Sequence, residues 1–509
     1  MSTPLPRTDA ELGELAFANL QAVVAIDSQS DEASPTIPTT EGQRRLGQVL
    51  ARYYVGAGAT VEQDAQANVL AWLPGRGARA GAAPVAFMVH VDTARGTQAV
   101  PALNVLRGWD GTRVPYPRNP TICVDLDTYP AAAGFVGHDL VYGPGDFPFG
   151  LDDKLGLAYC MSLATILAGA ACDHPPLVFI GRPDEEVGRD AAVVGLAALL
   201  AARGVRCGYT VDGILPFEVN TENFYAAVAH VGFAGGPARP LEGAPFVAHI
   251  GGVNTHGATA HAEGHRAAPR LVAEWAGALA RHEVVFDRFV SDALRDCDAV
   301  VHLRIADGAE QRVRDALEAV MAPHVRRGAT FRLEPGAAVE GDAAVEAMLD
   351  WLATFYASAP GFTLPCEDSH GRDGYSHPYR ARPVADGVQL DVRIRDFAAE
   401  GRTRRVEHVR GLAGGHRFAA EHQYENMGPR MAAHPELVEW AQAAAADVGV
   451  PVSIVPIRGG TGVDPFLDRG IPVANLGTGY FAPESEKELT SLQTMAHHLR
   501  WLYALVQRL

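Results

Sequence analysis

The sequence contains few cysteines, and none of them is closely spaced with another. The six cysteines are Cys123, Cys160, Cys172, Cys207, Cys297 and Cys366. Without a C-x-x-C pair they provide neither a disulfide framework nor a thiolate zinc site, and they suit a reducing compartment.

Long apolar runs and basic clusters are also missing. No segment reaches the roughly 18 apolar residues of a membrane-spanning helix, and the polar N-terminus lacks the apolar segment of a signal peptide. The formal net charge is −17, which argues against nucleic acid or anionic membranes as partners. We therefore expect a cytoplasmic protein. At 509 residues, it is expected to contain two or more domains.

Three consecutive acids, Asp184, Glu185 and Glu186, follow the apolar run 177–181. Such a run is typical of a buried strand in a parallel sheet, and ligands of open α/β sheets bind beyond the carboxyl ends of the strands. The acids repel one another unless a cation or a proton relieves them. Neighbouring side chains on an extended segment point in opposite directions, so one glutamate can hold a metal while the other faces a water molecule. The alternative is a solvated loop.

The order of elements predicts an α/β architecture, a mixed sheet flanked by helices, with an insertion. Strands and helices alternate up to about residue 223 and again near the C-terminus. The intervening segment contains longer alternating strands, typical of an α+β domain. It contains a strand–helix–strand pattern twice, at 300–307, 310–321 and 330–333 and again at 390–396, 404–412 and 417–422. We predict a discontinuous domain, 1–223 and 429–509, and an inserted domain, 224–428.

Histidine and acidic residues recur at the predicted strand ends and at one helix start. They are His90 with Asp92, Asp152, Glu185 with Glu186, and Asp212. Imidazole and carboxylate ligands from separate strand ends suit Zn²⁺, Mn²⁺ or Co²⁺. A rival metal site is His256, His261 and His265, although Gly257 and Gly264 interrupt the helix that this site requires.

Taken together, these motifs resemble the peptidase T (tripeptide aminopeptidase) branch of the aminoacylase- and glutamate-carboxypeptidase-like two-zinc hydrolases. The resemblance rests on His90-Val91-Asp92-Thr93, Asp152-Asp153-Lys154, Pro183-Asp184-Glu185-Glu186-Val187-Gly188, Tyr209-Thr210-Val211-Asp212-Gly213 and Ile457-Arg458-Gly459-Gly460-Thr461. It implies a zinc-exopeptidase fold with an inserted lid domain. It also implies a metal-dependent exopeptidase that acts on short peptides.

The resemblance also implies a role for each matching residue. His90 and Asp212 would hold one zinc, Asp152 would bridge two, and Glu186 would hold the second. Glu185 would be the general base, and Asp92 would support His90. His256 would be the lid histidine that stabilises the oxyanion, and Arg395 and Arg458 would bind a peptide carboxylate. The roles of His256, Arg395 and Arg458 compete with structural alternatives, a loop histidine and surface arginines paired with acids such as Asp396.

Three positions depart from the family pattern. An ungapped count places Lys487 where the last histidine ligand is expected, Gly462 replaces an acid, and Gly257-Ala258 replaces Pro-Gly after His256. A protonated lysine cannot bind zinc. Either Glu484, Glu486 or Glu488 reaches the second metal, or Lys487 pairs with Glu186 and the chain holds one metal. The alternative functions are therefore hydrolysis of another amide, such as an N-acyl amino acid or a specialised dipeptide, and peptide binding without turnover.

The repeated strand–helix–strand pattern also bears on oligomeric state. The family resemblance implies that a single lid pairs two subunits. A doubled lid could supply within one chain what a dimer supplies between two, so we expect a monomer, with a homodimer as the alternative.

Overall fold

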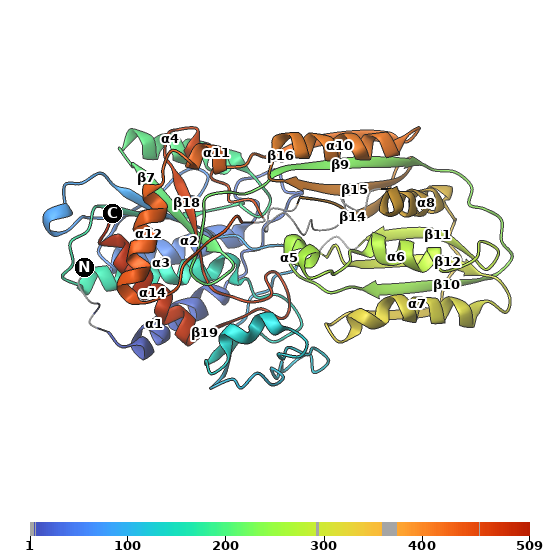
Figure 1. Ribbon diagram of the computed structural model, residues 1–509, viewed down its shortest axis with the longest axis horizontal. Helices are drawn as coiled ribbons and strands as arrows, with labels where there is room; N and C mark the ends of the chain where they lie inside the picture. Colours follow the sequence, from blue (N-terminus) through green and yellow to red (C-terminus); the bar gives the residue numbers. More distant parts are fainter. Residues whose placement is uncertain (1–4, 6, 292–294, 359–373, 458) are drawn as a thin grey trace. The chain divides into compact units, whose positions relative to one another are not determined.

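The computed structural model describes residues 5, 7–291, 295–358, 374–457 and 459–509. The chain forms two compact units (Figure 1). The first unit comprises Met1–Pro120, Val124–Asn223 and Met427–Leu509, and the second comprises Thr121–Cys123 and Phe224–Asn426.

The first unit is built on an eight-stranded mixed sheet, which confirms the predicted α/β class. The strand order is β1-β2-β6-β3-β7-β18-β8-β17. Strand β3 pairs in parallel with β6 and with β7, and β18 continues the parallel pairing beside β7. The strands are β1 (Thr60–Gln63), β2 (Val69–Leu73), β3 (Val85–His90), β6 (Leu177–Arg182), β7 (Cys207–Gly213), β8 (Glu218–Asn220), β17 (Ser453–Ile454) and β18 (Val473–Gly477).

The central strands are buried because their apolar residues face helices. Every residue of β3 and β6 is buried, as expected for strands that are covered on both faces. Phe87 lies 6.0 Å from Phe179 and 5.8 Å from Tyr209 between ring centroids, and each such ring contributes about 1.5–3 kcal/mol by burial. The helices are α1 (Asp9–Val24), α2 (Glu41–Gly56), α3 (Leu151–Gly169), α4 (Val194–Ala202), α12 (Glu436–Val448) and α14 (Leu492–Val506).

The segment between β3 and α3 also contributes to a small sheet. Its strands β4 (Asn104–Leu106) and β5 (Leu140–Tyr142) pair with each other, and β5 pairs with β19 (Leu489–Ser491) near the C-terminus. Residues 484–488, which precede β19, are thereby brought close to the start of α3.

The second unit contains two four-stranded antiparallel sheets with matching orders, β11-β12-β10-β13 and β14-β15-β9-β16. The strand–helix–strand pattern predicted twice is present twice, as β12-α7-β13 and β15-α10-β16. The two sheets meet where the Ala381 N–H of β14 donates to Ser291 Oγ of β11 over 2.9 Å, and their apolar residues share one core. The strands are β9 (Tyr225–Ala234), β10 (Ala244–Gly251), β11 (Val284–Ser291), β12 (Asp298–Ile305), β13 (Thr330–Pro335), β14 (Tyr375–Val384), β15 (Gly387–Asp396) and β16 (Arg417–Tyr424), and the helices are α5 (Gly257–Ala262), α6 (Ala268–Gly277), α7 (Glu310–Val325), α8 (Ala343–Ser358) and α10 (Ala399–Ala413).

The chain leaves the first unit and returns to it at adjacent residues. The Met427 N–H donates to Asn223 Oδ1 over 2.7 Å, and both residues belong to the first unit. This hydrogen bond joins the last residue before the insertion to the first residue after it.

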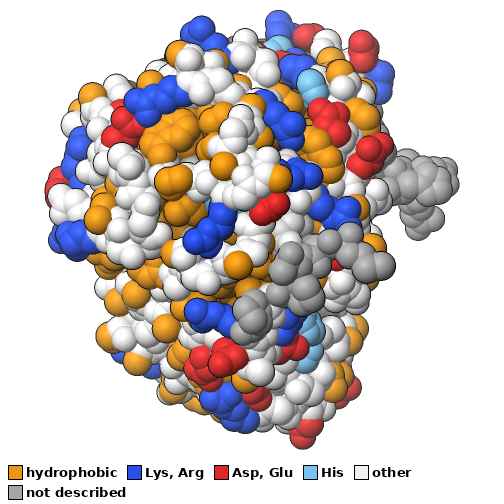
Figure 2. Space-filling view, turned by 90° about the vertical axis from the view of Figure 1, so that its left-hand side faces the viewer, with side chains coloured by type: hydrophobic (Ala, Val, Ile, Leu, Met, Phe, Trp, Pro, Cys, Tyr) orange, Lys and Arg blue, Asp and Glu red, His pale blue; other side chains and the backbone are white. Residues whose placement is uncertain are grey.

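Charged side chains of both signs are interspersed over the face shown in Figure 2. Across the described part of the chain, no helix is both long enough and apolar enough to cross a membrane.

Candidate metal centre

The predicted metal ligands of the strands meet at one edge of the sheet. His90 is the last residue of β3, and Asp212 lies at the end of β7. Glu185 and Glu186 follow β6, whose last residue, Arg182, stands opposite His90 in the parallel register. Since β3 lies between β6 and β7, the three carboxyl ends deliver their side chains to one place.

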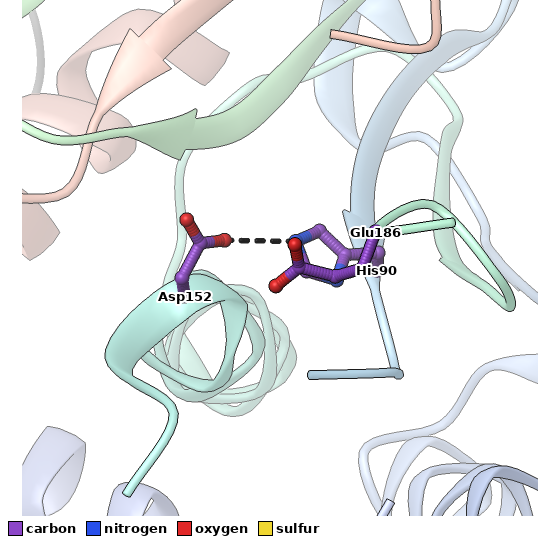
Figure 3. Close-up of side chains that lie close together, drawn as sticks. All are labelled: His90, Asp152 and Glu186. Atoms are coloured by element: carbon purple, nitrogen blue, oxygen red, sulfur yellow. Dashed lines mark hydrogen bonds and ion pairs between the residues drawn. The ribbon is translucent and has the colours of Figure 1, made fainter. Parts of the chain in front are cut away.

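His90 is the centre of this cluster. Its Nε2 lies 2.9 Å from Asp152 Oδ1 and 3.4 Å from Asp212 Oδ1. Its Nδ1 donates to the backbone carbonyl of Asp92 over 3.0 Å, which directs Nε2 towards the acids. Figure 3 shows Asp152 reaching Nε2 from α3, with the Glu186 carboxylate beside the ring.

The Asp92 carboxylate holds the turn that carries the two glutamates. Its Oδ1 accepts the Glu185 N–H over 3.0 Å and its Oδ2 accepts the Glu186 N–H over 3.1 Å. It also lies 3.4 Å from His90 Nδ1. The contact with His90 was anticipated from the sequence, whereas the two backbone contacts were not.

Asp152 and Asp153 precede the regular part of α3, because neither has helical dihedral angles. Tyr480 donates its hydroxyl to Asp152 Oδ2 over 3.1 Å. Asp153 Oδ2 accepts the His90 N–H over 3.1 Å. Gly156 is required here, because a β-carbon at this position would lie 2.0 Å from the Val211 carbonyl oxygen and 2.2 Å from Asp153 Oδ1.

The buried carboxylates of the cluster repel one another, and burial and this repulsion shift their pKa values. Burial and repulsion from Asp212 raise the pKa of Asp153 well above its usual range, and burial and Asp152 do the same to the pKa of Glu186. Burial raises the pKa of Asp212 to about 7 despite the attraction of His90. For His90, burial alone would lower the pKa, but Asp212, Asp152 and Asp92 raise it well above 6.5.

This arrangement fits a divalent cation. Ligand atoms of His90, Asp152 and Glu186 lie within 4.8 Å of one another, as do those of His90, Asp153 and Asp212. Glu186 Oε1 is buried and has no hydrogen-bond partner among the described residues. A buried carboxylate oxygen without a donor is costly, and a metal ion would both satisfy it and relieve the repulsion.

In the segment before β19, the Lys487 Nζ donates to Glu486 Oε1 over 2.9 Å, an ion pair that neither alternative drawn from the sequence included. Glu488 Oε2 accepts the N–H groups of Phe149 and Gly150, and its Oε1 accepts the Glu484 N–H over 3.0 Å. The Glu484 carboxylate is close enough to raise the pKa of Glu186, after burial and Asp152.

The remaining predicted residues lie elsewhere in the chain. His256 immediately precedes α5, and Arg395 is a buried residue of β15, both in the second unit. Arg395 Nη1 donates to the Ile394 carbonyl over 2.9 Å, and the guanidinium lies over the Tyr424 ring. Arg458 lies outside the described residues. The side chain of His261 is likewise not described, so the rival histidine site stays a prediction, while His265 Nε2 contacts Glu263 at 2.8 Å.

Sequence reasoning missed Asp153, Tyr480 and Arg182 as members of the cluster. Asp153 belonged to a recognised motif, and Arg182 was visible as a charge that ends an otherwise apolar strand. Tyr480 matched the family pattern but was given no role, because only the folded chain brings it to Asp152.

Comparisons with known proteins identify the family of the chain. The sequence model of peptidase family M20/M25/M40 matches residues 122–508. Peptidase T of Shouchella clausii is 25% identical over 484 residues, covering 92% of each chain. Peptidase T of Exiguobacterium sibiricum is 25% identical over 503 residues, covering 96% of this chain and 97% of its own.

Solved structures show the same fold. Aminoacylhistidine dipeptidase of Vibrio alginolyticus matches with a TM-score of 0.53 and 16% identity, covering 97% of this chain and 96% of its own. Aminopeptidase PepT of Bacillus cereus matches with a TM-score of 0.51 and 16% identity, covering 97% and 98%. The resemblance inferred from the sequence motifs is confirmed.

Proposed function

Because the chain belongs to peptidase family M20/M25/M40, and is thus a hydrolase of the peptidase class, we propose that it is a metal-dependent exopeptidase of short peptides with tripeptide aminopeptidase-like activity. The observation that carries this proposal is the carboxylate cluster around His90, in which Glu186 Oε1 is buried without a described partner. The peptidase T relatives support the substrate class.

Five residues would hold the metal: His90, Asp152, Glu186, Asp212 and, as the last ligand, Glu484. One or two ions would bind, with Zn²⁺ preferred and Mn²⁺ or Co²⁺ as alternatives, because imidazole and carboxylate donors suit all three. A bound divalent ion polarises a carbonyl group and lowers the pKa of water. We assign the last ligand to Glu484 rather than Lys487. The Lys487 ammonium forms an ion pair with Glu486, whereas the Glu484 carboxylate is near enough to Glu186 to raise its pKa.

Glu185 would be the general base. Its backbone is fixed by Asp92, and its side chain is 16% exposed, so its carboxylate can reach a water molecule without losing its anchored position. It would take a proton from the attacking water and deliver it to the leaving amine. His256 would stabilise the oxyanion, and Arg395 and Arg458 would bind the peptide carboxylate; these three roles rest on the family resemblance.

We assign the discontinuous unit to catalysis and the inserted unit to the lid, and we propose a monomer. The second unit already pairs two similar sheets through β11 and β14. A pairing of this kind within one chain would make a partner subunit unnecessary.

The test is metal content followed by product release. The purified protein should contain a divalent metal and should release amino acids from a tripeptide panel. A chelator should remove activity, and Zn²⁺, Mn²⁺ or Co²⁺ should restore it.

N-acyl amino acids and dipeptides form parallel arms of the same assay. Turnover confined to those arms would replace the proposed substrate. Bound metal with peptide binding but no turnover of any amide would contradict the exopeptidase and favour a peptide-binding protein.

A further inference from the structure

Arg182 introduces a permanent positive charge into the cluster. It ends β6, and its side chain is 3% exposed. Its Nη1 donates to the Gly462 carbonyl over 2.9 Å and its Nη2 donates to the Thr461 carbonyl over 2.8 Å. A guanidinium keeps its proton in proteins, so these two carbonyls fix a charge rather than a titrating group.

The same guanidinium faces two acids of the cluster. Its Nη2 lies 3.5 Å from Glu185 Oε1 and 4.0 Å from Asp212 Oδ2. The other oxygen of Asp212 lies 3.4 Å from His90 Nε2. The Asp212 carboxylate therefore lies between the imidazole and the guanidinium, whereas the structure gives Glu186 Oε1 no such partner among the described residues.

Gly462 makes room for this charge. It has φ +54°, and a β-carbon there would lie 2.2 Å from Arg182 Nη1 and 3.1 Å from its Cζ. Any side chain at position 462 would have to displace the guanidinium. Arg182 and Gly462 thus form a sterically matched pair.

We propose that Arg182 is a positioning residue whose fixed charge makes the two metal positions unequal, so that a divalent ion held by His90 and Asp212 is bound more weakly than one held by Asp152 and Glu186. This inference rests on the proposed function, in which these residues hold divalent metal. The guanidinium repels a cation that is bound to Asp212, and it also competes with that cation for the carboxylate oxygens of Asp212. A unit charge within several Å of a divalent ion changes binding by roughly tenfold or more at a protein-like dielectric.

The first measurement uses the unaltered protein. After chelator treatment and dialysis, titration with Zn²⁺ against a fluorescent chelator should resolve two equivalents whose affinities differ at least about tenfold. Glu186→Gln should remove the tight equivalent, and Asp212→Asn should remove the weak one. Two equal affinities, or loss of the tight equivalent in Asp212→Asn, would overturn the inference.

The second measurement tests the charge itself. Arg182→Gln should bind the weak equivalent about tenfold more tightly, whereas Arg182→Lys, which keeps the charge, should stay near the parent. A merely structural role would give unchanged or weaker binding in Arg182→Gln, because the segment 461–462 would lose its anchor. Arg203→Gln is the matched control, since Arg203 is a surface arginine whose Nη2 donates to Glu62, and it should leave both affinities unchanged.

A third arm tests the steric pairing. Gly462→Ala should lower thermal stability in the presence of chelator, and Arg182→Gln should reverse part of that loss in a double-mutant cycle. Additive effects would contradict the pairing. A parent protein that takes up no divalent ion would refute the proposed function and this inference together, whereas two bound ions with an unresponsive Arg182→Gln would refute the inference alone.

Discussion

Replacing Asp212 by asparagine should stabilise the metal-free protein above neutral pH. Burial raises the pKa of Asp212 from 3.8 to about 7. Between these values the native state binds more protons at this site than the unfolded state does. The stabilisation that comes from protonating Asp212 in the native state is therefore fully present below about pH 4 and is lost as the pH rises through 7. An asparagine side chain at this position carries no charge and avoids this loss.

The magnitude follows from the shift. A change from 3.8 to about 7 corresponds to roughly 4 kcal/mol at about 1.36 kcal/mol per pKa unit. The value of about 7 already includes the attraction between Asp212 and His90. Burying the polar asparagine amide has a cost of its own, so we expect a net gain of about 2 kcal/mol at pH 8.

The assay is urea denaturation with and without chelator at pH 5 and pH 8. With Zn²⁺ in place of chelator, the parent should be more stable than the variant. A bound ion at 1,000 times its Kd adds about 4 kcal/mol to the stability of the parent, whereas Asp212→Asn lacks one of the side chains proposed to bind the ion. A variant that is less stable than the parent at pH 8 in chelator would refute the reasoning.

Asp184→Asn is the matched control. Asp184 is also buried, but it accepts hydrogen bonds from the Thr39 N–H, the Thr39 hydroxyl and Gln43 Nε2. Its replacement should destabilise the protein to a similar extent with chelator and with Zn²⁺, since its partners are donors rather than a metal.

Three further predictions concern catalysis, stability and assembly. Glu185→Gln should retain metal but lower peptide turnover by a factor of about 100 or more. As a control, substitution of the exposed Glu41 by glutamine should leave turnover unchanged. Normal turnover in Glu185→Gln would remove Glu185 from the mechanism. His498 is stacked between Tyr159 and Phe217, and burial lowers its pKa to about 3. The free energy of unfolding should therefore fall as the pH drops from about 6.5 towards 3, and His498→Phe should flatten that slope in urea denaturation. An unchanged slope would contradict this. Light scattering should give a monomer at micromolar concentration, and a tight dimer would refute the role assigned to the doubled sheets.

Much of the fold and the centre of the site could be predicted from sequence, because the informative signals are local. Strand β6 is a short apolar run followed by acids, and β3 and β7 end in His90 and Asp212. Once three such runs are taken as parallel strands, their ends must share an edge. The repeated strand–helix–strand pattern was predictable for the same reason, since each element has its own hydrophobic period.

Contacts between distant segments could not be predicted in this way. Tyr480 reaches Asp152 across more than 300 positions, and no periodicity records that. Counting along the chain singled out Lys487, but Ala482 and Glu484 both have left-handed φ values, +56° and +54°. The backbone changes direction there, so position in the count does not give the direction of the side chain.

The hydrogen bond between Met427 and Asn223 makes the inserted unit separable in principle. Because the flanking residues already touch, a linker of about two or three residues could join them, and the cost of closing so short a loop is small. The candidate metal centre and its sheet could then be expressed as a minimal protein, without residues 224–426. Insertions of very different length could be exchanged at this junction, so the inserted unit can vary while the strand ends of the first unit stay unchanged.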